Sequence, residues 1–166
     1  MGKVAWSSDA ASQMLRLKDH LFDDYDGLVR PVKDGISTTI VTYRMLLYAL
    51  LDMSWIDEFL TWNATEFGGI EVIHVPAERV WLPDITLHQN ADDIFERYKP
   101  NTYVNVFYDG LVIWYVPTIF GSSCRQRVRY FPFDTQICDM TLSSWAYDGN
   151  HIEIQAEAGA DSEQSR

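Results

Sequence analysis

The two cysteines, Cys124 and Cys138, are the residues whose chemistry is easiest to specify from type and spacing. Thirteen residues separate them, and a disulfide that closes such a loop would stabilise the fold by roughly 3 kcal/mol in the chain-entropy model. The alternative is two unrelated buried thiols in a cytosolic protein, because free cysteine is often buried. Spacing alone leaves both alternatives open.

The other reactive side chains form no catalytic pattern. The four histidines have no metal-ligand spacing among themselves or with the cysteines, and the sequence has neither a glycine-rich phosphate loop nor a nucleophile-elbow serine. Carboxylate pairs such as Asp23-Asp24 and Asp92-Asp93 could suggest a glycosidase, but solvated turns explain them more simply. We expect no enzyme, catalytic residue, cofactor or metal site; a carbohydrate-active or other hydrolytic sandwich is a remote alternative.

The composition indicates one acidic domain rich in aromatic residues. Of 166 residues, 47% are hydrophobic and 14% aromatic, which is enough for one sizeable core. Thirteen basic and twenty-four acidic residues give a formal charge of -11, which argues against nucleic acid as a partner and favours cations. We find no stretch like a membrane-spanning helix, and the first residues do not resemble a secretory signal peptide.

The elements that would position these residues are mostly short strands. Helical spacing of apolar residues over 8–25 predicts one amphipathic helix. After Val32, β-branched and aromatic runs alternate with Gly, Pro, Asn and Asp, which is typical of an all-β sandwich or barrel with about eight or nine strands. The apolar run 45–51 fits a strand or a buried helix, and its context favours a strand.

Glycine dipeptides mark the turns between these strands. Asp109-Gly110 lies between the apolar runs 103–108 and 111–116, and Asp-Gly supplies the positive φ values that a two-residue hairpin turn needs. Gly68-Gly69 and Asp148-Gly149 separate further strands. We expect a single domain over 1–157 and a polar, frayed tail over 158–166.

The loop between the cysteines carries a family resemblance. Phe131, Pro132, Phe133 and Asp134 within a Cys-x13-Cys frame resemble the signature loop of the Cys-loop, pentameric ligand-gated ion channels. Other segments agree in the family's order: LFDDY (21–25) with RPV (30–32), WN (62–63) with FGG (67–69), VWLPD (80–84) and WAYDG (145–149). The likeness spans about 15–157 and is closest to nicotinic acetylcholine receptor subunits.

The resemblance implies an immunoglobulin-like β-sandwich with a short N-terminal α-helix. Such domains assemble as a pentamer on the extracellular face of the plasma membrane, here postsynaptic by resemblance. The resemblance further implies a disulfide between Cys124 and Cys138. It also implies a loop tip that couples ligand binding to the channel, made of Phe131, Pro132, Phe133 and Asp134. The implied ligand is a cationic small molecule such as acetylcholine, bound between homologous subunits.

The tryptophans divide into two groups. Three are expected in the core: Trp62, Trp81 and Trp114. Trp145 lies in a segment that resembles the family's principal-face loop, where a tryptophan meets a quaternary ammonium for about 2 kcal/mol when desolvated. Tyr147 and His88 belong to the same implied face, although His88 stands where acetylcholine-binding subunits usually have tyrosine, and imidazole is a poorer partner for a cation. A tryptophan that merely packs is the alternative for Trp145.

The resemblance also implies a complementary face that serves a neighbouring subunit's site. Trp55 aligns with the tryptophan of that face, and simple packing is its alternative. Asn105, Ile113 and Tyr115, from the predicted hairpin, belong to the same face.

The sequence departs from the family in its spacing and its end. The stretch 30–55 is shorter than the family's usual spacing. The last two strands, their capping loop and the four transmembrane helices are expected to be absent from this chain. Membrane contact would then come only through those absent helices in a longer chain or through the helices of partner subunits. The alternative function is a truncated soluble isoform, or a module like the acetylcholine-binding protein, that modulates full-length subunits. Asn63 begins an Asn-Ala-Thr sequon for N-glycosylation, consistent with secretion.

Overall fold

The structure is a computed structural model that describes residues 8–46, 49–88, 102–119, 121–124, 126 and 128–157. In these residues the chain forms one α-helix, eight strands and three short 3-10 helices. Their order is α1 (Ser8–Phe22), β1 (Thr39–Leu46), β2 (Ala49–Thr61), η1 (Ala64–Phe67), β3 (Val72–Pro76), η2 (Ala77–Arg79), β4 (Ile85–Leu87), β5 (Tyr103–Phe107), β6 (Asp109–Ile119), η3 (Val128–Tyr130), β7 (Leu142–Ser144) and β8 (Ile152–Ala156). The predicted tail, 158–166, lies outside the described residues.

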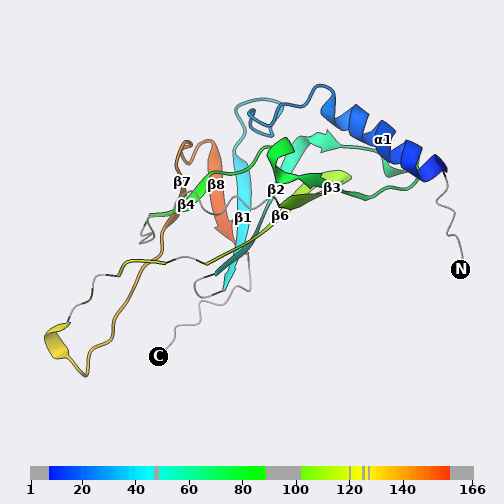
Figure 1. Cartoon of the computed structure of the whole chain (residues 1–166). Helices are drawn as coiled ribbons and strands as arrows, with labels where there is room; N and C mark the ends of the chain where they lie inside the picture. Colours follow the sequence, from blue (N-terminus) through cyan, green and yellow to red (C-terminus); the bar gives the residue numbers. More distant parts are fainter. Residues whose placement is uncertain are drawn as a thin grey trace, which may run out of the picture.

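The strands form a large and a small sheet. Six strands pair in the order β3-β5-β6-β2-β1-β8, and β4 pairs with β7 in a second sheet. The pairs are antiparallel except β1 with β8, which runs parallel from Thr39↔Ile152 to Tyr43↔Ala156. Figure 1 shows β4 and β7 beside the larger sheet. The predicted all-β, sandwich-like architecture with an N-terminal helix is confirmed.

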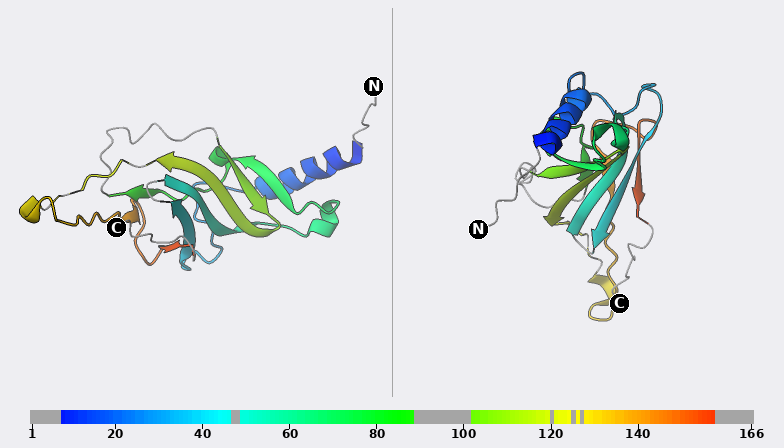
Figure 2. Two further views of the ribbon diagram at one scale, coloured as in Figure 1. Left: turned by 90° about the horizontal axis from the view of Figure 1, so that it is seen from below. Right: turned by 90° about the vertical axis from the view of Figure 1, so that its right-hand side faces the viewer.

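The molecule is elongated, and two predicted features lie at its opposite ends. Helix α1 packs along one end, and the loop closed by Cys124 and Cys138 projects from the other (Figures 1 and 2). The helix is amphipathic, as predicted, because Leu17 and Leu21 are buried while Leu15 is exposed.

The aromatic core lies on the inner face of the larger sheet. Trp62, Trp81 and Trp114 are 7%, 3% and 7% exposed, which confirms their predicted place in the core. Trp62 Nε1 donates to the carbonyl of Ile70 at 2.7 Å, and Trp114 Nε1 donates to the Thr102 hydroxyl at 2.8 Å. These bonds satisfy the polar edge of each ring, so burial of the ring carries no orphaned donor.

The helix ends earlier than its apolar spacing predicts, at Phe22 rather than at Tyr25. Tyr25 has a different role, because its hydroxyl donates to Asp57 Oδ2 at 2.7 Å and accepts from the Trp81 amide at 2.9 Å. Asp57 is fully buried, and burial raises the pKa of its carboxyl. This network joins the segment after α1 to β2 and to the segment before β4.

Two turn regions show where sequence patterns succeed and fail. The 103–116 hairpin is confirmed: β5 pairs with β6 through Val106↔Val112, and Gly110 has φ 88°. A side chain there would also meet the Asp57 carbonyl oxygen at 2.6 Å from its Cβ. The described residues of the run 45–51 are extended, as predicted, but they are divided between two strands, since Met45 on β1 pairs with Leu50 on β2.

Candidate functional site

Trp145 presents its ring to solvent directly after β7. Trp145 is 78% exposed, the most open of the tryptophans in the part of the chain that the structure describes. The backbone beneath it is held by Asp84, whose Oδ2 accepts from the amides of Trp145 at 3.0 Å and Ala146 at 2.6 Å. Asp84 Oδ1 accepts from the Ser144 hydroxyl at 2.6 Å. One carboxylate therefore fixes the loop and leaves the aromatic face free.

His88 and Tyr147 lie on the same small sheet unit as Trp145. Strands β4 and β7 pair through Leu87↔Leu142, so His88 follows β4 beside β7. Its Nε2 forms a hydrogen bond with the Ser143 hydroxyl. The Tyr147 amide donates to the Ser144 hydroxyl at 2.9 Å, and its half-buried ring lies 6.4 Å from that of His151. The structure thus gathers the three residues predicted for the principal face around β4 and β7.

Three of the four residues predicted for the complementary face lie on the outer side of the larger sheet. Asn105 on β5 pairs directly with Ile113 on β6. Tyr115 follows two residues later on the same side of β6 and is 48% exposed. His74 Nδ1 lies 2.7 Å from Asn105 Oδ1, which adds β3 to this row. Asn105, Ile113 and Tyr115 therefore share one accessible face.

Trp55 does not share that face. It pairs with Val112, is 2% exposed, and packs edge-to-face on Trp81 with ring centroids 5.8 Å apart. Because side chains alternate along a strand, the β2 residues on the outer face are those beside Trp55. Trp55 therefore has no free ring face for a ligand in this structure, and it packs in the core, which is the alternative given for it above.

The sequence analysis missed the β2 residues on the outer face. Asp52 lies opposite Tyr115, and Ser54 lies opposite Ile113. The signal that could have revealed them is the two-residue period of β2, counted from a buried Trp55. The assignment of Trp55 by resemblance concealed that period.

A pocket of about 180 Å³ opens on this outer face and contains charged groups of both signs. Arg44 forms an ion pair with Asp52, which its Nε also approaches at 3.0 Å. Glu157 Oε2 lies 3.8 Å from the same Nε. The Asp52 bond raises the pKa of Arg44 above its ordinary value. The pocket combines two aromatic residues with two carboxylates and one guanidinium; its remaining lining residues are Thr42, Tyr43, Ser54, Ile113 and Tyr115.

The disulfide loop has the pairing and the apolar tip that the resemblance implies. Cys124 and Cys138 are bonded, with Cα atoms 5.4 Å apart. The tip includes Phe131 and Phe133, which are 78% and 93% exposed, and the exposed Pro132, which follows a cis peptide bond. Asp134 accepts a hydrogen bond from the Gln136 side chain. A rigid closure thus displays apolar groups far from α1 (Figure 2).

The sequon residue Asn63 is exposed at the start of η1. Its Oδ1 accepts from the Thr65 hydroxyl at 2.9 Å and from the Thr65 amide at 3.2 Å. The side chain is therefore at the surface and close to the hydroxyl residue of its own sequon.

Two kinds of feature are absent from the described residues. Within them, no three or more His, Cys, Asp or Glu side chains gather as a metal site would require. No helix in the same residues is long and apolar enough to span a membrane.

Most of the chain is similar in sequence to receptor subunits of known family. Residues 44–166 match the profile of the neurotransmitter-gated ion-channel ligand binding domain. Over 155 residues, covering 84% of the chain, it is 38% identical to the acetylcholine receptor subunit alpha-type unc-63 of Caenorhabditis elegans. It is 39% identical over the same length to acetylcholine receptor subunit alpha-like 2 of Drosophila melanogaster and to neuronal acetylcholine receptor subunit alpha-9 of Homo sapiens. The matches cover 31%, 27% and 32% of these relatives, so the chain spans less than a third of their length.

Proposed function

Because the chain belongs to the neurotransmitter-gated ion-channel ligand-binding domain family and resembles nicotinic acetylcholine receptor subunits, we propose that it binds a cationic neurotransmitter such as acetylcholine between homologous subunits of a pentamer. Binding gates a cation channel. The domain lies on the extracellular side of the plasma membrane and acts by conformational change rather than by catalysis.

The observation that carries the proposal is the exposed ring of Trp145 on a loop fixed by Asp84. A quaternary ammonium over a tryptophan face gains about 2 kcal/mol once both are desolvated. The fixed backbone matters because an aromatic group that is already in place loses less conformational entropy when the ligand arrives. Tyr147 and His88 flank the ligand on this principal side.

The complementary side comes from a neighbouring subunit. Trp145 follows the small sheet, whereas Tyr115, Ile113 and Asn105 lie on the outer face of the larger one. Two half-sites on different sheets support a site that is completed by a second subunit. Trp55 is left out of this site because it is buried. Asp52 lies across from Tyr115, where its carboxylate is paired with Arg44.

His88 has a fixed place in the proposed site. Its Nε2 is engaged with the Ser143 hydroxyl, so the ring is oriented towards β7. An imidazole is a poorer partner for a cation than a phenol, so His88 contributes less to the ring contacts of the ligand than a tyrosine would.

The disulfide loop transmits the binding event. Its exposed tip, with Phe131, Pro132, Phe133 and Asp134, contacts the membrane domain of the assembled receptor, and closure by Cys124 and Cys138 keeps its shape. A glycan on Asn63 is consistent with the exposed position of that residue on an extracellular domain.

The test joins this chain to the pore domain of a relative such as the alpha-9 subunit and measures acetylcholine-evoked currents. Loss of about 2 kcal/mol at Trp145 corresponds to roughly 30-fold weaker binding, so Trp145→Ala should remove most of the response and Trp145→Phe should retain part of it. Tyr108→Ala is the matched control, since Tyr108 is an exposed aromatic residue at the β5–β6 turn. Equal responses of Trp145→Ala and Tyr108→Ala would refute the proposal.

A further inference from the structure

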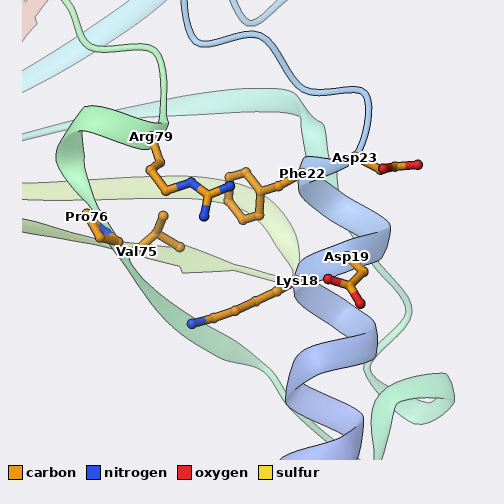
Figure 3. Close-up of a pocket in the computed structure, with 7 residues that line it drawn as sticks. All are labelled: Lys18, Asp19, Phe22, Asp23, Val75, Pro76 and Arg79. Atoms are coloured by element: carbon orange, nitrogen blue, oxygen red, sulfur yellow. The ribbon is translucent and has the colours of Figure 1, made fainter.

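A second pocket lies at the opposite end of the molecule from the disulfide loop, between α1 and the β3–η2 segment. It has a volume of about 220 Å³. Figure 3 shows its lining side chains, which come from two turns of the helix and from the end of β3 with η2: Lys18, Asp19, Phe22, Asp23, Val75, Pro76 and Arg79. None of them belongs to either half of the site proposed above.

Among the described residues, the two cations of this pocket have no anionic partner. Neither Lys18 nor Arg79 forms an ion pair or a hydrogen bond with any residue that the structure describes. Figure 3 shows Lys18 and Arg79 reaching into the space between helix and strand, whereas the carboxylate of Asp23 points away from that space and the carboxylate of Asp19 lies over the front of the helix. The space between helix and strand therefore receives two cationic side chains, in a chain with a formal charge of -11.

Three apolar residues form part of the pocket wall, and one of them holds the guanidinium in place. Arg79 Cζ lies 5.2 Å from the centroid of the Phe22 ring, a cation–π contact that restricts the arginine. Val75 is buried and Pro76 is half-buried, and both contribute apolar surface without a competing charge. An arginine so restricted keeps its planar fork of N–H donors available for two parallel bonds to a carboxylate.

We propose that this pocket binds a small organic anion, specifically a monocarboxylate with a flat apolar body. The carboxylate bonds Arg79 and Lys18, and the body packs between Phe22 and Pro76. The volume excludes larger ligands, because drug-sized ligands occupy pockets of about 300–1,000 Å³. The ligand thereby bridges α1 to the larger sheet, and it has the opposite charge from the neurotransmitter proposed for the other site.

Benzoate is the probe, titrated into the full, oxidised chain while backbone amide shifts of residues 18, 22 and 79 are followed by NMR. Benzamide has the same ring without the charge, and we expect it to bind at least tenfold more weakly. Lys18→Gln should weaken benzoate at least fivefold. Lys33→Gln is the matched control, because it removes the same charge from an exposed lysine outside the pocket and should leave the affinity unchanged.

A second variant separates loss of binding from loss of structure. Arg79→Lys keeps the positive charge but loses the planar fork, so benzoate should bind more weakly while the amide spectrum outside the pocket is preserved. Equal affinities for benzoate and benzamide, or equal effects of Lys18→Gln and Lys33→Gln, would overturn the proposal. So would shifts confined to residues outside the pocket. Because acetylcholine is absent from the assay, failure here leaves the proposed neurotransmitter site untouched.

Discussion

Removing the Asp84 carboxylate should loosen the loop that carries Trp145 and leave the larger sheet intact. Asp84 accepts three hydrogen bonds, from the amides of Trp145 and Ala146 and from the Ser144 hydroxyl. A hydrogen bond to a charged group contributes about 1.5–3 kcal/mol, but both amides belong to exposed residues and can bond water instead. We therefore expect Asp84→Ala to cost about 2 kcal/mol of loop order in total.

This loss of order should reduce ligand affinity. If acetylcholine binds only the ordered loop, its apparent Kd rises in proportion as the ordered fraction falls, and about 2 kcal/mol limits the rise to roughly 30-fold. The assays are acetylcholine titration of the pore-domain chimaera and amide hydrogen exchange at Trp145 and Ala146. Exchange at both amides should accelerate, and the sheet amides of β6 should stay protected.

The chain offers a matched control in Asp34. This carboxylate also accepts from two amides, those of Ile36 and Ser37, and from the Ser37 hydroxyl, but in the loop before β1. The same bonds hold the pKa of Asp34 below its ordinary value. Asp34→Ala should loosen its own loop without changing acetylcholine affinity. Unchanged exchange at Trp145 in Asp84→Ala, or equal losses of affinity in both variants, would refute the reasoning.

Three further predictions concern stability and modification. Burial raises the pKa of Asp57, so the folded state binds its proton more tightly than the unfolded chain. Urea unfolding should therefore show stability falling as pH rises above 3.8 through the folded-state pKa. A pH dependence of stability that Asp57→Asn leaves unchanged would contradict this. Cys124→Ser should lower stability by roughly 3 kcal/mol. Reductant should lower the melting temperature of the unmodified protein but not that of the variant. An unmodified protein whose melting temperature does not change with reductant would contradict this. Asn63→Gln, expressed in secreting eukaryotic cells, should reduce the mass by one glycan, whereas Thr65→Ser should retain it; identical masses for Asn63→Gln and the parent would count against the sequon.

Much of the fold could be predicted because short-range chemistry determines it. The hairpin required a glycine at the β5–β6 turn, and Gly110 has a positive φ there. The disulfide loop could be predicted from its resemblance because its frame and its tip lie within one stretch of sequence. The helix end could not, since Tyr25 continues the apolar spacing of α1 but leaves the helix to bond a carboxylate 32 residues away. Tertiary bonding overrode local periodicity at that point.

Trp55 lies on the opposite face of the sheet from the one that the resemblance implies, because alternate residues of a strand face opposite sides. A tryptophan in the expected segment looks like a ligand contact, but a shift of one residue along a strand moves a side chain to the opposite face of the sheet. Trp55 pairs with Val112 and is buried, whereas Asp52 pairs with Tyr115 and lines the outer pocket. Burial of Trp81 against Trp55 gives the physical reason, because edge-to-face packing fills the core. The β2 residue that lines the outer pocket is therefore the carboxylate Asp52, whereas the resemblance implied the aromatic ring of Trp55.

The loop of Trp145 depends on the smallest sheet of the domain. Asp84 immediately precedes β4, and Trp145 immediately follows β7, so the pairing Ile85↔Ser144 is what places the carboxylate beneath the two amides. The partners are 61 residues apart in sequence, and neither strand is longer than three residues, so no local pattern announces their contact. Short strands contribute few ladder bonds, and such regions open at lower free energy than a core sheet. Asp84 offsets this lability, because it holds the amides of Trp145 and Ala146 in place. A substitution that weakens the β4–β7 pair should therefore reduce affinity for the proposed ligand before it affects the stability of the larger sheet.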